Sequence, residues 1–440
     1  MKFTEQEARQ SFLELLRIPS VTGTAGEEQA CAYLEGILDR FGIAHRRICR
    51  DPKRPNLLAK LTAVNPTEDP MILISHIDVV SGDPEKWTHG LFSADCEDGR
   101  IWARGTLDTK HLTVMELYAF LHLAGQEAEL NRDVYFLATI DEEQGSAYGM
   151  GYVRQAEPEL FQKGMVINEG GGFPLRINGK NYMMLTVGEK AVCKVRLTAT
   201  GTGGHASAPG ADQAMLKMAK ALKNIFSREE ELQCGSHRTQ NTQAAIVGSR
   251  EWDNPVGADI FGYAGQNSIS MRSFQLGERS NVIPAQVEAL LEFKVLPYSP
   301  PEEITAFLDR VLEDCQVSYA VESYEDGFES SFDNSRLQEL ICQIQRSCTR
   351  FGFDGGVLPM LALGRTDGRF FAGGKAMVYG LSPLTMGDSF DVILPKVHGN
   401  DESILEDSFR FGCRVLDEII CNNCGCPGAI ASVDNGEVLS

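Results

Sequence analysis

The stretch PMILISHIDVV (residues 70–80) places a short apolar run between a proline and a pair of polar side chains. Three similar runs lie in the first half of the chain: NLLAKLTAV (56–64), DVYFLATI (133–140) and GMVINEGGG (164–172). A helical pattern, TVMELYAFLHLAGQ (113–126), lies between two of these runs. Short apolar strands that alternate with helices predict an α/β fold in which helices flank a mixed central sheet.

The pattern changes at about residue 186. The segments 184–210 and 287–297 alternate apolar and polar residues, as an antiparallel sheet with one solvated face does. Helical patterns at 211–226 and 301–315 accompany them. After about residue 328 the α/β pattern returns and ends in the predicted helix DESILEDSFRFGCRVLDEII (401–420).

These changes predict two domains, and the length of the chain agrees. A chain of 440 residues exceeds the size at which one hydrophobic core keeps growing. We predict a discontinuous α/β domain made of residues 1–185 and 326–440. A smaller α+β domain, residues 186–325, is inserted between its two segments.

The charge of the chain restricts its partners. A formal net charge of -20 argues against a nucleic acid or an anionic membrane surface, since both favour a basic face. The first twenty residues carry an amphipathic helical period and no apolar run long enough for a signal peptide or membrane span. We therefore expect a cytoplasmic protein that acts on small molecules or peptides.

The twelve cysteines are expected to be reduced thiols, because their spacing is irregular and the expected compartment is reducing. The tail CNNCGCPG (421–428) is the exception, since Cys421, Cys424 and Cys426 lie close enough to share a metal. No fourth ligand adjoins them. A flexible, reduced tail is the favoured interpretation.

Side chains that can bind metals gather at the ends of the predicted strands and in turns. They are His76, Asp78, Asp108, Glu142, Glu143, Glu169 and His398. Each has a simpler interpretation: a lone histidine in a strand is more often a satisfied core or surface residue. Asp108 could cap a helix, and the glutamates could be solvated strand ends.

As a set, these side chains favour a metal site. Two histidines and three carboxylates suit two divalent cations, which a carboxylate can bridge. Because no thiolate is among them, a catalytic site open to water fits better than a structural zinc site. A further acid would then act as general base.

The motifs carry a family resemblance. In order, SHIDVV, ARGTLDTK, DEEQG, NEGG, GGHASAP, NVIPAQVEALLEFKVLP, GRTDGRFF and VHGNDES resemble those of the di-zinc metallopeptidase family that includes carboxypeptidase S, aminoacylase, glutamate carboxypeptidase and succinyl-diaminopimelate desuccinylase. The match runs from about residue 53 to 410. The segment from WTHGLFSAD to DEEQG is most similar to the carboxypeptidase S branch.

The resemblance implies a role for each residue of the metal site. Asp108 would bridge two ions, most simply zinc, although cobalt or manganese also accept such ligands. His76 and Glu169 would complete one site, and Glu143 and His398 the other. Two further roles are implied: Glu142 as the general base and Asp78 as the support of His76. The bond between Asp108 and Thr109 would be cis.

The inserted domain would act as a lid and form a homodimer. His205 would reach the active site of a partner subunit and stabilise the oxyanion there. Asn281 would also face the substrate. Without the resemblance, His205 would be a polar turn residue. Lys294 stands where the family usually has an arginine that binds a substrate carboxylate, so only a point charge is offered there. Carboxylate recognition would then rest on Arg369.

Two further positions depart from the family's pattern. His111 and Arg365 each replace a usual glycine. We interpret His111 as a residue of a helix start rather than a new neighbour of the active site.

The expected function is a metal-dependent amide hydrolase that cleaves a peptide or an N-acyl amino acid with a free carboxylate. Carboxypeptidase, dipeptidase and deacylase activities all remain open. A di-metal phosphatase or nuclease is disfavoured because the chain shows no basic groove or phosphate-binding loop. A non-catalytic scaffold is a further alternative, although such a chain would be expected to lose ligands or the base.

Overall fold

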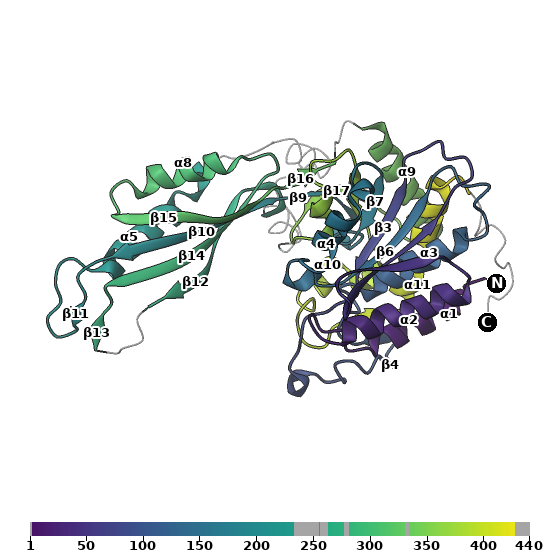
Figure 1. Cartoon of the computed structure of the whole chain (residues 1–440), viewed down its shortest axis with the longest axis horizontal. Coiled ribbons are helices and arrows are strands. Elements are labelled where there is room, and N and C mark those ends of the chain that lie inside the picture. Colours follow the sequence, from purple (N-terminus) through teal and green to yellow (C-terminus); the bar gives the residue numbers. More distant parts are fainter. Residues whose placement is uncertain (1, 233–254, 256–262, 277–280, 331–333, 427–440) are drawn as a thin grey trace. The chain divides into compact units, whose positions relative to one another are not determined.

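The computed structural model describes residues 2–232, 255, 263–276, 281–330 and 334–426 (Figure 1). These residues form two compact units. The first unit contains the described residues up to Val187 and from Ser330 onward, and the second contains those from Gly188 to Glu329 apart from residue 255. The division of the chain near residues 185 and 325 is retained as our proposal for its domains.

A mixed sheet forms the centre of the first unit. Its strands are β1 (His45–Asp51), β2 (Arg54–Leu61), β3 (Met71–His76), β6 (Val134–Thr139), β7 (Met165–Asn168), β8 (Pro174–Ile177), β9 (Lys180–Glu189), β17 (Gly356–Ala362) and β18 (Met377–Gly380). They follow the order β1-β2-β6-β3-β7-β18-β9, and β8 and β17 also pair with β9. From β6 through β3 and β7 to β18 the neighbours are parallel, whereas β1, β2 and β9 pair antiparallel. The predicted fold class is confirmed.

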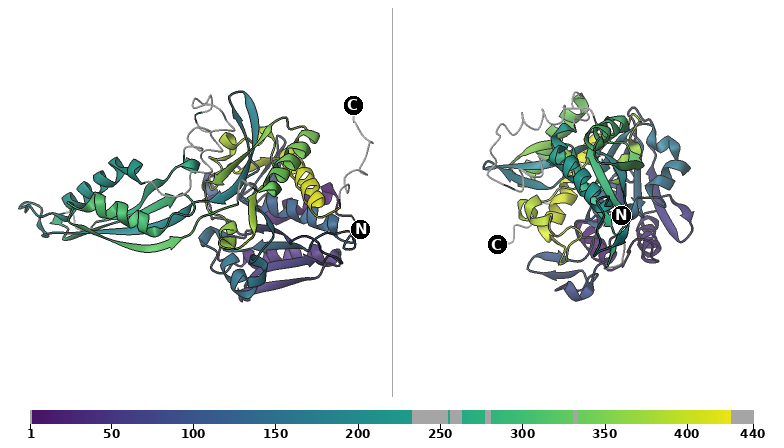
Figure 2. Two further views of the ribbon diagram at one scale, coloured as in Figure 1. Left: turned by 90° about the horizontal axis from the view of Figure 1, so that it is seen from above. Right: turned by 90° about the vertical axis from the view of Figure 1, so that its left-hand side faces the viewer.

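Helices pack along this sheet (Figures 1 and 2). They are α1 (Glu5–Leu16), α2 (Gly26–Arg40), α3 (Lys110–Leu123), α4 (Met150–Ala156), α9 (Ser335–Arg350), α10 (Phe390–Ile393) and α11 (Glu406–Asn423). Every residue of α3 except His122 is buried, so this helix is covered on all sides. Among the described residues, no helix is both long and apolar enough to cross a membrane. A cytoplasmic location stays a prediction.

The last helix begins later than the sequence predicted. Ser403–Leu405 forms β19 and pairs with β5 (Arg100–Trp102), which also pairs with β4 (Asp95–Glu97). Helix α11 therefore begins at Glu406, because the residues before it are held as a strand by a segment far away in the sequence.

The cysteines near the end of the described chain are not part of a flexible tail. Cys421 lies in α11, and Cys424 and Cys426 are also buried. The expectation of a flexible tail is wrong for these residues, because α11 continues to Asn423 and the chain beyond it stays packed. Residues 427 and 428 of the quoted tail lie outside the described range. No candidate metal group found among the described residues includes these thiols.

The second unit is built on an antiparallel sheet with the order β12-β14-β10-β15. Its elements are β10 (Ala191–Thr200), β11 (Gly204–His205), α5 (Ala214–Ser227), β12 (Ser268–Gln275), β13 (Val282–Ile283), β14 (Gln286–Val295), α8 (Pro301–Leu312), β15 (Val317–Glu325) and β16 (Phe328–Glu329). Alternate residues of β10 and β14 are buried with apolar residues of α5 and α8 in one hydrophobic core. The period of two in the sequence thus marks the core face of this sheet.

His122 joins α3 to the N-terminal segment and to α11. Its Nδ1 lies 3.0 Å from Asp417 Oδ1, and its Nε2 lies 2.9 Å from the carbonyl oxygen of Phe3. Because both partners accept hydrogen bonds, the doubly protonated imidazolium satisfies both contacts. Burial alone would lower the pKa of His122, but the hydrogen bond and the charge of Asp417, together with the bond to the Phe3 carbonyl, outweigh it and the pKa is raised.

We expect His122→Asn to lower the free energy of unfolding by roughly 1.5–3 kcal/mol at low pH, the range for a hydrogen bond to a charged group. A raised folded-state pKa gives stability that is fully present below the unfolded value of about 6.5 and is lost as pH rises through the folded value. The measurement is urea unfolding of both proteins from pH 5.5 upward. A difference that grows as pH rises would contradict the assignment.

Candidate metal centre

Three parallel strands bring polar side chains to one edge of the sheet. Strand β3 ends at His76, which is paired in register with Thr139, the last residue of β6. Glu169 directly follows β7, the other neighbour of β3. The carboxyl ends of parallel strands meet at one edge of the sheet. The turn after β6 therefore lies on one side of His76, and Glu169 lies on the other.

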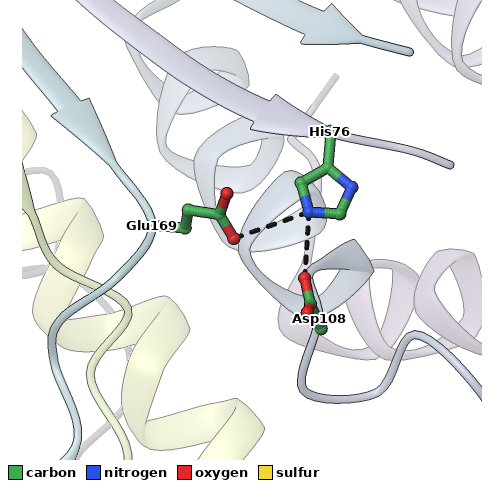
Figure 3. Close-up of side chains that lie close together, drawn as sticks. All are labelled: His76, Asp108 and Glu169. Carbon is green, nitrogen blue, oxygen red and sulfur yellow. Dashed lines mark hydrogen bonds and ion pairs between the residues drawn. The ribbon is translucent and has the colours of Figure 1, made fainter. Parts of the chain in front are cut away.

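The first group of possible ligands contains His76, Asp108 and Glu169 (Figure 3). His76 Nε2 lies 2.9 Å from Asp108 Oδ1 and 3.5 Å from Glu169 Oε2. Asp108 lies in the loop before α3, and its peptide bond to Thr109 is cis, as the resemblance implied. These side chains thus converge from three separate segments.

The second group contains Asp108, Glu143 and His398. His398 Nε2 lies 2.9 Å from Asp108 Oδ2 and 3.1 Å from Glu143 Oε2. The two oxygens of Asp108 thus face different histidines, so this carboxylate is common to both groups. Glu143 Oε1 is buried and has no hydrogen-bond partner among the described residues, as suits an oxygen that binds a cation.

Burial and charge act strongly on these groups. Burial raises the pKa of Glu169 to about 7 and also raises that of Glu143, which the neighbouring Asp108 reinforces. Hydrogen bonds to Asp108 and Glu143 raise the pKa of His398 to about 10. Burial alone would lower the pKa of His76, but the nearby carboxylates raise it well above its usual range. A divalent cation would offset this repulsion between carboxylates, and its binding would release protons.

The donor set fits divalent metal ions. Every possible ligand in the two groups is an imidazole nitrogen or a carboxylate oxygen, which zinc, manganese and cobalt all accept. Within each group the ligand atoms lie within 4.8 Å of one another. The described residues could therefore hold cations at two adjoining positions that share Asp108.

Glu142 lies beside the ligands without being one of them. It begins the short 3-10 turn Glu142–Gln144 after β6, and its Oε1 lies 3.2 Å from Arg369 Nη1. Burial, reinforced by the charge of Glu169, raises the pKa of Glu142 well above its usual range. A partly buried carboxyl with a raised pKa next to a metal site is suited to proton transfer.

Asp78 connects the end of β3 to the turn that carries the glutamates. It accepts hydrogen bonds from the backbone amides of Glu142 and Glu143, at 3.3 and 3.4 Å, and from the hydroxyl of Thr22 at 2.7 Å. His76 Nδ1 lies 2.9 Å from the Asp78 carbonyl oxygen and 3.5 Å from Oδ1. These contacts fix the ring of His76 so that its Nε2 faces Asp108 and Glu169.

Asp141 points away from the ligands, which separates the three consecutive acids. Its carboxylate accepts a bond from Arg54 at 2.7 Å and another from the Tyr148 amide at 2.9 Å. Arg54 also forms a bidentate pair with the buried Glu27. The positive φ of Asp141, 66°, turns the chain here, so that only Glu142 and Glu143 face the centre.

Some residues of the predicted site belong to the second unit. His205 is exposed in β11, and its Nδ1 lies 2.8 Å from the Ser207 hydroxyl. Asn281 is exposed, and its backbone carbonyl accepts a hydrogen bond from the Ala206 amide. Lys294 is half-buried in β14. The catalytic and substrate-binding roles of these residues stay predictions.

His111 is the second residue of α3, as a helix-start residue should be, but the charges of Asp108 and His76 also act on it, so it lies near the candidate ligands as well. It is fully buried, and neither ring nitrogen has a hydrogen-bond partner among the described residues. Burial lowers its pKa to about 3, so the ring is neutral at physiological pH.

Sequence reasoning missed Glu402, which helps to connect the loop that carries Asp108 with the loop that carries His398. Its carboxylate pairs with Arg104 at 2.7 Å and accepts the Leu107 amide at 2.7 Å, in the loop that leads to Asp108. Arg104 also donates to the carbonyl of Gly399, in the loop that carries the last histidine ligand. The only signal in the sequence was that Arg104 and Glu402 belong to motifs that also contain predicted ligands.

Comparisons with known proteins show which family and fold the chain is similar to. The model of peptidase family M20/M25/M40 matches residues 72–422. Aminoacylase-1 of Sus scrofa is 24% identical over 420 residues, which cover 93% of each chain. A probable carboxypeptidase S-like protein of Dictyostelium discoideum is 24% identical over 78% of this chain and 69% of its own length. The crystal structure of an M20 family metallo-carboxypeptidase from Sulfolobus solfataricus has a similar fold, with a TM-score of 0.72, 19% identity, and coverage of 96% and 99%.

Proposed function

The chain belongs to peptidase family M20/M25/M40, and we propose that it is a metal-dependent amide hydrolase that cleaves a small peptide or an N-acyl amino acid with a free carboxylate. One observation carries this proposal. Two ligand groups share Asp108, and a separate, partly buried carboxyl, Glu142, lies beside them. Such a site contains both the metal ligands and the base that hydrolysis requires.

The metal ligands of the first unit, its base and the support of His76 each have a role in the proposed reaction. His76, Asp108, Glu143, Glu169 and His398 would hold two divalent ions. When bound, these would acidify a water molecule and polarise the scissile carbonyl. Glu142 accepts the water proton on a carboxylate oxygen and then delivers it to the leaving amine nitrogen. Asp78 keeps His76 oriented through the contacts to its Nδ1.

The second unit would supply the remaining groups. We propose that His205 donates a hydrogen bond to the developing oxyanion from the partner subunit of a homodimer. Asn281 and Lys294 would bind polar groups of the substrate. Loss of a comparable oxyanion donor lowers kcat by roughly a hundred- to a thousand-fold.

A substrate panel tests the proposed function. Protein loaded with zinc, cobalt or manganese is incubated with dipeptides, N-blocked dipeptides and N-acetyl amino acids, each with a free or an amidated carboxylate. Amine release is then measured, together with the bound metal. We expect hydrolysis of at least one class with a free carboxylate and much slower hydrolysis of its amidated form.

The pattern of hydrolysis separates the remaining alternatives. Cleavage of N-blocked dipeptides indicates a carboxypeptidase, and a requirement for a free amine indicates a dipeptidase. Cleavage of N-acetyl amino acids indicates a deacylase, the activity that the name of the similar aminoacylase implies. Bound metal without release of amine from any substrate would contradict the proposal and favour a non-catalytic scaffold.

A further inference from the structure

The side chain of Arg369 is fixed next to Glu142. It lies in the short helical segment Asp367–Phe371 and is only 9% exposed. Its Nη1 donates to the carbonyl of Thr366 at 2.7 Å and lies 3.2 Å from Glu142 Oε1. Its Nη2 donates to the Ser146 hydroxyl at 3.0 Å. The planar guanidinium therefore reaches three protein groups in one orientation.

Asp367 supports this arrangement from the other side. It is buried and accepts the Ser146 hydroxyl at 2.5 Å and the Thr139 hydroxyl at 2.8 Å. Thr139 is the last residue of β6, and Ser146 follows the turn that carries Glu142. Both ends of this turn are thus attached to one carboxylate, which fixes the distance between the turn and Arg369.

These contacts connect Arg369 to the base through two routes. One is its direct contact with the Glu142 carboxylate, and the other passes through Ser146 to the turn itself. Glu142 would otherwise face the like charges of Glu169 and Asp367, which favour rotation of its carboxylate away from them. The guanidinium of Arg369 carries the opposite charge and is held in contact with the Glu142 carboxylate.

We propose that Arg369 is a positioning residue that holds the Glu142 carboxylate in its working orientation, with Asp367 and Ser146 as its support. The inference rests on the proposed function, in which Glu142 is the base. It differs from the prediction that Arg369 binds the substrate carboxylate, because the buried guanidinium already contacts the base, a backbone carbonyl and a hydroxyl.

Kinetics of Arg369→Ala and Arg369→Lys test this role. Misplacement of a catalytic group by about 1 Å costs up to roughly a hundred-fold in rate. We therefore expect kcat to fall about ten- to a hundred-fold in both variants, with KM changed less than about threefold and with unchanged metal content. Methylguanidinium is expected to restore part of the activity of Arg369→Ala, since it can occupy the position of the lost fork.

Arg132→Ala is the matched control. Arg132 is 6% exposed, lies just before the opposite end of β6 and pairs with Glu68 at 3.7 Å. It shares the burial and charge of Arg369 but not the contact with the base. We expect this variant to lose stability without loss of kcat and without rescue by methylguanidinium.

Two kinetic results would overturn the inference. A rise in KM at constant kcat, with loss of discrimination between free and amidated carboxylates, would assign Arg369 to substrate binding. Equal loss of kcat and equal lack of rescue in Arg369→Ala and Arg132→Ala would reduce its role to general stability.

A crystal structure of Arg369→Ala gives a readout that does not need turnover. We expect the Glu142 carboxylate to leave its wild-type orientation or to occupy more than one. A single, wild-type orientation would overturn the inference even if the protein proves to be an active hydrolase. A changed orientation would support it even if no substrate of the panel is cleaved, so the two proposals can fail separately.

Discussion

Replacement of Glu142 by glutamine is expected to lower kcat by about a hundred- to ten-thousand-fold while the bound metal stays at the wild-type level. Glutamine keeps the shape of the side chain but cannot accept and return a proton, and positioned general bases contribute on this scale. Metal binding should persist because Glu142 belongs to neither ligand group. The measurements are steady-state kinetics and elemental analysis of the same protein preparation.

Glu143→Gln is the matched comparison, since it makes the same chemical change one residue further along. Its carboxylate belongs to the second ligand group, so this variant is expected to lose metal as well as activity. Equal metal content and equal activity in the two variants would contradict this division of roles.

Replacement of Asp108 by alanine is expected to remove nearly all bound metal and nearly all turnover. Asp108 is the one residue common to both ligand groups, and its oxygens face His76 and His398 from 2.9 Å. A ligand at a hundred times its dissociation constant stabilises a folded protein by about 2.7 kcal/mol. We therefore also expect the wild type, and not the variant, to gain thermal stability when zinc is added.

The control for Asp108→Ala is Glu169→Ala, which removes a carboxylate from the first group only. This variant should retain part of the metal and part of the thermal stabilisation. If Asp108→Ala kept the metal content of the wild type, Asp108 would not be the shared ligand, and the two groups would not form one centre.

Elements governed by local patterns could be predicted from the sequence. Strands β3, β6 and β7 are nearly continuous apolar runs because both faces of a parallel sheet are buried, and β10 alternates because one of its faces is solvated. Helix α3 was predicted three residues late at each end, although its apolar core was found. Segment boundaries depend on distant partners, as the pairing of β19 with β5 demonstrates.

The candidate site divides in the same way. Side-chain chemistry is a property of single residues, so the metal ligands and the base could be recognised as residue types at strand ends and in ordered motifs. Glu402 and Arg369 could not be assigned their contacts in this way, because a glutamate or an arginine near a motif has many possible partners. Which partner it meets depends on loops that fold against each other.

The sequence by itself determined which groups are available: an α/β sheet with carboxylates and histidines at its strand ends, and the family to which the motifs belong. Only the tertiary structure decided how they meet. Parallel pairing of β3 with β6 and β7 brings His76, Glu143 and Glu169 to one edge, and the Arg104–Glu402 pair brings the loops of Asp108 and His398 together. The physical reason is range: strand and helix patterns follow from neighbouring residues, whereas ligand geometry follows from contacts between segments far apart in the chain.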